Sequence, residues 1–163
     1  MCSPTPDDIP MNPGQAPGFM LVRTSTRMRL GLRRVLLATG RDITPEQWAV
    51  LVTLAFEQGL TQCAIGERLV KDKATLTRIL DRMEERGLVA RKPDGRDRRS
   101  HRLFLTPDGE ALRRTVLPAV RAYAEDIFAG LTPEDLDTLK ALLAKINTRI
   151  PDCCPRSSQC SGV

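Results

Sequence analysis

Basic side chains are concentrated in one part of this chain, between residues 68 and 102. This segment holds twelve Lys and Arg residues against six Asp and Glu residues, a net charge of +6, while the whole 163-residue chain carries +5. The remaining residues therefore sum to −1, so the positive excess lies in one module. Clustered Lys and Arg side chains bind phosphate-rich polymers strongly. The segment therefore predicts a surface that binds a polyanion.

Part of this charge falls on one face of a helix expected over residues 73–86. The apolar residues recur at intervals of three and four, which predicts a buried stripe of Leu76, Ile79, Leu80 and Met83. Arginine on the opposite side can bind both acceptors of a guanine edge, while hydroxyl and lysine groups bind phosphates. A solvated amphipathic helix would show the same pattern, so this helix alone does not decide. We predict DNA contacts from Lys73, Thr75, Thr77, Arg78 and Arg82.

A basic β-hairpin is expected directly after this helix. Residues 88–91 form a short strand candidate, residues 93–95 (Pro-Asp-Gly) are typical of a turn, and residues 99–105 alternate in polarity. That alternation predicts one inward face, formed by His101, Leu103 and Leu105. Six basic residues lie within residues 91–102, and a tip this basic repels itself unless it meets an anion. We therefore predict further DNA contacts from Arg96, Arg98 and Arg99.

The elements that must position these residues are mainly helices. A Thr-Pro-acid sequence occurs at residues 44–46, 106–108 and 132–134. Each is typical of a helix start, because Thr caps free N–H groups and Pro fits the first turn. With the apolar spacing, these starts predict helices over residues 19–38, 45–59, 62–70, 107–127 and 133–150. A short helix, a second helix and a hairpin in this order form a winged helix-turn-helix. The expected fold class is mainly α with a small β-hairpin wing.

This pattern divides the chain into five parts. Residues 43–106 form the DNA-binding domain, residues 19–42 form a dimerisation helix, and residues 107–150 form C-terminal dimerisation helices. Residues 1–18, rich in proline and glycine, and residues 151–163 are expected to be flexible. The flanking helices carry broad apolar stripes that need burying, and a homodimer is the simplest solution. Pro118 should bend the helix that contains it.

The chain resembles the MarR family of winged helix-turn-helix regulators from about residue 19 to residue 150. The resemblance is most specific at residues 76–89 (LTRILDRMEERGLV) and at residues 94–106, where DGRDRRS precedes LFLT. It implies a homodimeric DNA-binding regulator whose terminal helices form the dimer and whose wings enter minor grooves. It also implies that Asp97 orients one wing arginine while Arg98 or Arg99 inserts. Two departures are Lys71, where such proteins often have an apolar residue, and Gly66 inside a helix, which costs about 1 kcal/mol relative to Ala.

The resemblance also implies a small-molecule effector. Family members commonly respond to a small aromatic acid, a phenol or an oxidant, and the site is expected between the winged module and the dimer helices. The candidate residues are Met28, Trp48 and the inward-facing His101, with Arg27 as a carboxylate partner. Each also fits an ordinary core or surface role. The leading hypothesis is a repressor that leaves a pseudo-palindromic operator in double-stranded DNA when this effector binds.

Other functions find less support in the sequence. Four of the five cysteines lie in the termini, which is not a secreted disulfide framework. Cys63 lies near a helix start, where thiolate is favoured, so an oxidant-sensing regulator is an alternative, although a small buried Cys is the simpler role. Residues 19–30, where some family members carry the reactive thiol, contain no Cys.

A protein-interaction module built on the winged helix is the alternative from another class.

His101 is the only His, so a His-based metal site or a catalytic triad lacks its residues. We expect no enzyme activity, no metal and no cofactor. No apolar run reaches the length that spans a bilayer, and the first residues do not resemble a signal peptide. A cytoplasmic location without a membrane partner is expected.

Overall fold

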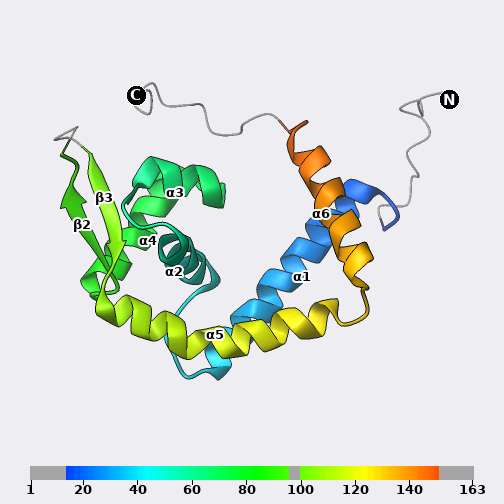
Figure 1. Cartoon of the computed structure of the whole chain (residues 1–163), viewed down its shortest axis with the longest axis horizontal. Helices are drawn as coiled ribbons and strands as arrows, with labels where there is room; N and C mark the ends of the chain where they lie inside the picture. Colours follow the sequence, from blue (N-terminus) through cyan, green and yellow to red (C-terminus); the bar gives the residue numbers. More distant parts are fainter. Residues whose placement is uncertain (1–13, 96–99, 151–163) are drawn as a thin grey trace.

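The computed structural model describes residues 14–95 and 100–150 (Figure 1). In order, its elements are α1 (Pro17–Ala38), α2 (Pro45–Phe56), β1 (Leu60–Thr61), α3 (Gln62–Leu69), α4 (Lys73–Glu85), β2 (Val89–Pro93), β3 (His101–Leu105), α5 (Pro107–Phe128) and α6 (Pro133–Asn147). The expected fold class is confirmed, and the expected helix bounds lie within about three residues of the observed ones. The segments expected to be flexible, 1–18 and 151–163, lie mostly outside the described residues.

The three Thr-Pro helix starts act as predicted. The Thr44 hydroxyl accepts a hydrogen bond from the Gln47 backbone N–H at 3.2 Å, and the Gln47 side chain accepts one from the Thr44 N–H at 3.1 Å. Thr132 and Asp135 form the same reciprocal pair at the start of α6. Thr106 caps α5 by accepting from the Gly109 N–H at 3.0 Å. Such a cap contributes about 1 kcal/mol to stability, so these local contacts set where the three helices begin.

The hydrophobic core lies inside the winged module, around α2. Val50, Leu51 and Leu54 of α2 have no exposed surface. The same cluster includes the predicted inner stripe of α4, where Leu76, Leu80 and Met83 are buried and Ile79 is half-buried. Burying one such side chain contributes about 1.5–3 kcal/mol. Leu36 of α1 and Val116 of α5 also belong to this cluster, so the long flanking helices are packed onto the winged module.

The wing is part of a three-stranded antiparallel sheet in the order β1-β3-β2. Leu103 of β3 pairs with Leu60 of β1 on one side and with Arg91 of β2 on the other. Strand β1 was not predicted, because two residues are too short to show an alternating pattern. Its pairing with β3 attaches the wing to the start of α3.

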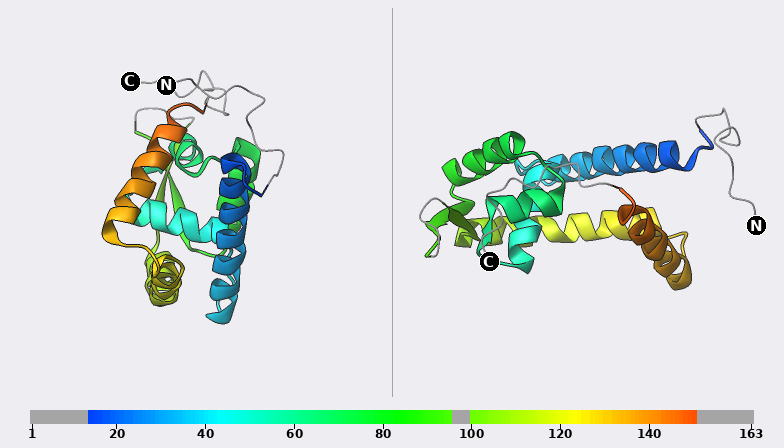
Figure 2. Two further views of the ribbon diagram at one scale, coloured as in Figure 1. Left: turned by 90° about the vertical axis from the view of Figure 1, so that its right-hand side faces the viewer. Right: turned by 90° about the horizontal axis from the view of Figure 1, so that it is seen from above.

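The flanking helices carry an apolar surface that the described chain does not cover. α5 continues through Pro118 as one helix and runs from the wing to α6, and α1 and α6 reach the end opposite the wing (Figures 1 and 2). α6 buries none of its residues. The large apolar side chains that remain exposed include Phe19, Leu30, Leu37, Leu142, Leu143 and Ile146. Even so, none of the helices described is both long and apolar enough to cross a membrane.

α1 and α5 approach each other closely at Gly31. A Cβ atom placed at Gly31 would lie 2.2 Å from the hydroxyl oxygen of Tyr123. That hydroxyl donates a hydrogen bond to the Met28 carbonyl oxygen at 2.9 Å, one turn earlier in α1. The missing side chain of Gly31 therefore makes room for the aromatic ring that links the two helices.

Candidate nucleic-acid interface

Helix α4 is held at its N-terminus by a cap and a tight turn. The Asp72 carboxylate accepts a hydrogen bond from the Thr75 backbone N–H at 2.9 Å, and this bond lowers the pKa of Asp72. The preceding turn places Val70 in the left-handed region, with φ of 50°. The Lys71 N–H then bonds to the Gly66 carbonyl at 2.9 Å. A Cβ at Gly66 would lie 3.1 Å from the Lys71 carbonyl oxygen, so glycine inside α3 allows this turn to close.

The outer face of α4 carries cations that are free to bind an anion. Lys73, Arg78 and Arg82 are exposed, whereas Thr75 and Thr77 are half-buried. Within residues 14–95 and 100–150, these three cations have no ion-pair partner. All five residues predicted to contact DNA from this helix thus lie away from its buried stripe. In the described part of the chain, the charge of the three basic residues is not neutralised by a carboxylate.

The flanking basic residues are mostly engaged by the protein itself. Arg68 pairs with Glu57 at 2.5 Å, and Arg86 pairs with Asp42 at 3.7 Å. Lys92 lies over the ring of Phe104, 4.9 Å from its centroid. The basic segment is therefore not one uniform patch, because several of its cations have neighbours that compete with an external anion.

Arg91 joins the wing to helix α4. Its guanidinium contacts Asp81 at 2.7 Å and Glu84 at 2.6 Å, and its backbone N–H donates to Glu84 at 3.2 Å. Arg91 is itself only 22% exposed. The charge of Arg91 is thus neutralised on the side of α4, and its role is to hold β2 against that helix. From the sequence alone, Arg91 is only one of the basic residues of the hairpin.

A second arginine braces the base of the loop at the tip of the wing. Arg102 contacts Asp94 at 2.9 Å through Nε and donates to the Gly59 carbonyl at 2.9 Å through Nη1. Asp94 is 8% exposed, and its backbone N–H bonds to the Ser100 carbonyl at 3.0 Å, which closes the hairpin. The predicted wing residues Arg96, Asp97, Arg98 and Arg99 lie outside the described residues, so their contacts remain predictions.

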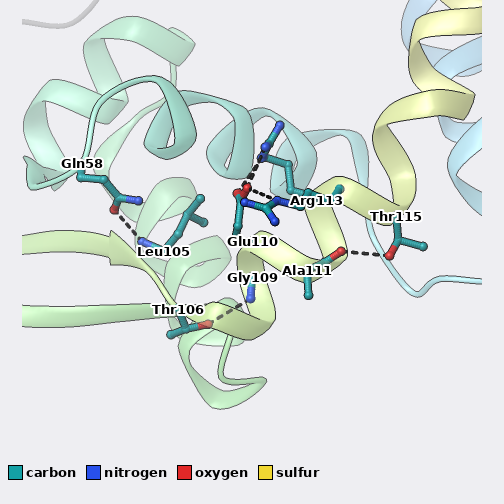
Figure 3. Close-up of polar contacts among 9 residues, drawn as sticks. Gln58, Leu105, Thr106, Gly109, Glu110, Ala111, Arg113 and Thr115 are labelled. Atoms are coloured by element: carbon teal, nitrogen blue, oxygen red, sulfur yellow. Dashed lines mark hydrogen bonds and ion pairs between the residues drawn. The ribbon is translucent and has the colours of Figure 1, made fainter.

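Polar contacts surround the junction between β3 and α5, where Figure 3 shows the Gln58–Leu105 bond and the Thr106–Gly109 cap. The Gln58 side chain accepts a hydrogen bond from the Leu105 N–H at 2.9 Å, and the Thr106 hydroxyl donates to the Gly87 carbonyl at 2.5 Å. A Cβ at Gly109 would lie 2.0 Å from the Leu88 carbonyl oxygen, so the helix and the hairpin backbone are in direct contact. The first turn of α5 and the residues that precede β2 are therefore packed together without an intervening side chain.

The Glu110 carboxylate forms ion pairs with two arginines in the next turn of α5. Its carboxylate accepts from Arg113 at 2.7 and 2.8 Å and from Arg114 at 2.7 Å. Hydrogen bonds from Arg113 first, and then from Arg114, lower the pKa of Glu110 to about 2. This cluster keeps Glu110 ionised well below the pH at which an ordinary Glu is protonated, and it holds Arg113 and Arg114 against α5.

A cavity of about 390 Å³ lies between α4 and the flanking helices α1, α2 and α5. Its wall is mostly apolar and includes Leu76 and Ile79, from the inner stripe of α4. Lys71 is half-buried in the wall and has no ion-pair partner within the described parts of the chain. At the edge, Arg29 and Glu46 form an ion pair of 3.4 Å. The volume and character are those of a small-ligand site.

The structure brings only part of the predicted effector site together. Met28 lines the cavity, but Arg27 is exposed on α1 outside the lining, and Trp48 is buried in the core. His101 is exposed, not inward-facing as the alternation predicted. It is the first residue of β3 and pairs with Pro93, where the hairpin has already extended beyond the core that covers Leu103.

The sequence missed the polar lining of the cavity, namely Arg29, Glu46, Lys71 and the Tyr123 ring. The one sequence signal for this lining was Lys71, which lies where similar proteins often have an apolar residue. Cys63 differs as well: it is half-buried in the first turn of α3, with its Sγ 3.8 Å from the Glu67 Oε1 atom, so it is not the fully buried residue expected. In the described ranges, His, Cys, Asp and Glu side chains form no cluster suited to a metal ion.

Comparison with known proteins gives one consistent result. Residues 41–100 match the model of the MarR family. The chain is 35% identical over 105 residues to the transcriptional regulator HosA of Escherichia coli, covering 64% of this chain and 78% of HosA. It is 31% identical to a solved MarR-family transcriptional regulator from Silicibacter pomeroyi, with a TM-score of 0.70 and coverage of 82% and 88%. A mutant MarR from Escherichia coli complexed with operator DNA is 28% identical, with a TM-score of 0.72 and coverage of 79% and 91%.

Proposed function

This chain belongs to the MarR family of transcriptional regulators, and we propose that it is a dimeric repressor released from a pseudo-palindromic operator by a small effector. The observation that carries this proposal is the set of exposed cations on α4, which have no ion-pair partner in the described part of the chain and lie beside neighbours whose charge is already engaged. A helix with that arrangement is suited to enter a major groove. The structural relative that binds operator DNA supports this use of the fold.

In the proposed complex, α4 reads bases and the wing holds the backbone. Arg78 is the candidate for a bidentate contact with guanine, while Lys73 and Arg82 are placed for phosphates. Arg96, Arg98 and Arg99 are proposed to contact a minor groove, with Asp97 orienting one of them, on the family resemblance alone. Two such units in a symmetric dimer would meet half-sites about one helical turn apart.

Charge and apolar surface both favour a second copy of this chain as the partner of α1 and α6. α1 carries five arginines and no acidic residue, whereas α6 begins with Glu134, Asp135 and Asp137. Both helices also expose large apolar side chains. A two-fold dimer would bring the basic helix of one protomer to the acidic helix of the other, burying surface that is too apolar to stay in water.

The cavity fits a small aromatic or other apolar effector that carries one negative charge. The charged groups in the lining are Arg29, Glu46 and Lys71, a net charge of +1, and among the residues that the structure describes the Lys71 ammonium has no counter-ion. The occupant would touch the back of α4 through Leu76 and Ile79. A ligand can release DNA only if it binds the two conformations with different affinity, and this contact supplies a route.

The DNA part of the proposal is tested with Arg78→Ala. A bidentate guanine contact contributes roughly 1–3 kcal/mol, so its loss from both protomers of the proposed dimer should weaken operator binding by roughly 2–6 kcal/mol, about 30-fold or more. Arg41→Ala is the matched control, because Arg41 is an exposed arginine in the loop before α2. Duplex affinity that is unchanged in Arg78→Ala would contradict DNA reading by α4 and would favour a protein-interaction module.

The effector part is tested with Lys71→Met, which keeps the apolar stem and removes the charge. Operator affinity should stay near the wild-type value, while release by aromatic acids should be lost. Lys71→Arg, which keeps the charge, should retain release. Equal release by aromatic acids from wild type and Lys71→Met would refute the role of Lys71.

A further inference from the structure

Gln62 ties the start of α3 to the DNA-facing part of α4. Its side-chain Nε2 donates to the Thr77 hydroxyl oxygen at 2.6 Å and to the Lys73 carbonyl oxygen at 3.3 Å. The Thr77 hydroxyl in turn donates to the Lys73 carbonyl at 2.7 Å. Three polar groups thus meet beside the N-terminal turn of α4, and Gln62 is the one that does not belong to that helix.

The direction of these bonds fixes how the Gln62 amide is oriented. A hydroxyl has one proton, and that of Thr77 is already given to the Lys73 carbonyl. With that proton committed, the short contact between Gln62 and Thr77 is an N–H that donates to the Thr77 oxygen. If the amide were turned over, its carbonyl oxygen could take the Thr77 proton but would face the Lys73 carbonyl oxygen without a proton between them. The Nε2 group of Gln62 is consequently engaged with two acceptors inside the protein.

The group left for an external partner is an acceptor. Within residues 14–95 and 100–150, the Gln62 Oε1 atom accepts no hydrogen bond, and Thr77 has a lone pair but no proton to offer. Phosphate oxygens are acceptors too, so they cannot bond to the Gln62 Oε1 atom or to the Thr77 oxygen. In a major groove, the available donors are the amino groups of adenine and cytosine. Guanine and thymine present acceptors at the corresponding place and would be repelled.

We propose that Gln62 is a specificity-determining residue, which with Thr77 selects adenine or cytosine over guanine or thymine at one position of each half-site. The proposal rests on the proposed entry of α4 into the major groove. It also changes the role predicted for Thr77, from a phosphate donor to a base-facing acceptor that is held in place by a residue of the preceding helix.

The test is selection from a randomised duplex pool with the full-length protein and three variants. Gln62→Ala removes the acceptor and frees the Thr77 hydroxyl to turn. Thr77→Val removes the hydroxyl and frees the Gln62 amide to turn. Thr115→Val is the matched control, because Thr115 is an exposed threonine of α5 that makes the same bond to the carbonyl four residues earlier. Urea unfolding of each variant checks that the fold is kept.

Wild type and Thr115→Val should disfavour guanine and thymine by about fivefold at one symmetric position, the effect of a single hydrogen bond. Gln62→Ala and Thr77→Val should lose that preference while keeping the others. If both variants lower affinity for all sequences alike and keep every preference, the pair is only structural and the inference is overturned. If the wild type enriches no duplex at all, it is the proposed DNA-binding function that fails.

Discussion

Gly109 offers a quantitative test of how the hairpin and α5 are joined. In Gly109→Ala, the new methyl carbon would start 2.0 Å from the Leu88 carbonyl oxygen. Carbon–oxygen contacts in proteins are about 3.3 Å or longer, so the two backbones must separate by about 1.3 Å. The obstacle is a backbone atom, which cannot swing aside as the end of a flexible side chain does.

The expected cost follows from three contributions. Overpacking of this kind costs about 1–3 kcal/mol, and weakening the Thr106 cap adds up to about 1 kcal/mol. Alanine in a helix recovers up to about 1 kcal/mol relative to glycine. The unfolding free energy should therefore fall by about 1–3 kcal/mol.

Urea unfolding at one fixed protein concentration measures this change, since the stability of the proposed dimer would depend on concentration. Gly18→Ala is the matched control: Gly18 also follows the start of a helix, and a Cβ there meets nothing within 4 Å. The control should be as stable as wild type or slightly more stable. A Gly109→Ala protein that is no less stable than wild type would refute the proposed backbone contact.

Three further predictions concern the turn before α4, the Glu110 cluster and the wing base. Val70→Gly should raise the unfolding free energy by up to about 1 kcal/mol in urea unfolding, because a left-handed residue with a branched side chain is strained. A clear fall in the unfolding free energy would show that the turn is not strained. Glu110 has a lowered pKa of about 2, so its contribution is present above its unfolded value near 4.5 and is lost as the pH falls toward 2. Wild type should therefore lose more stability than Glu110→Gln between pH 5 and pH 2.5, and parallel pH curves would contradict this. Asp94→Ala should lower the unfolding free energy by about 1–3 kcal/mol, because it leaves the Arg102 guanidinium without its carboxylate; unchanged stability would show that the wing base does not depend on this pair.

Most of the fold could be predicted because its helix starts and stripes are local properties. Thr44, Thr106 and Thr132 each act within three residues of chain, and the stripe of α4 repeats within a few turns. Strand β1 could not be predicted, since its two residues are a strand only through pairing with β3. The exposure of His101 depends likewise on where the core ends beneath the hairpin. Alternation along one strand carries no information about that position.

The residue types of the candidate site could be predicted from the sequence, but the separate role of each residue could not. Charge counting cannot distinguish Arg78, which is unpaired in the described chain, from Arg91, which is held by two carboxylates, because those contacts join separate elements. The effector residues failed for a similar reason. Arg27 and Arg29 are two positions apart on α1, and only the packing of α1 against α2 shows that Arg29 reaches the cavity.

The central claim is that the structure separates cations that bind DNA from cations that hold the protein together. The most direct measurement is the salt dependence of operator binding for Arg82→Ala and Arg68→Ala. Each phosphate contact contributes about −0.9 to the slope of log K against log salt. Arg82 is unpaired in the described chain, so its loss from both protomers should flatten the slope by about 2. Arg68 is paired with Glu57, and its loss should change the slope by less than half as much. Equal changes in the two variants, or a slope that neither variant alters, would contradict the claim.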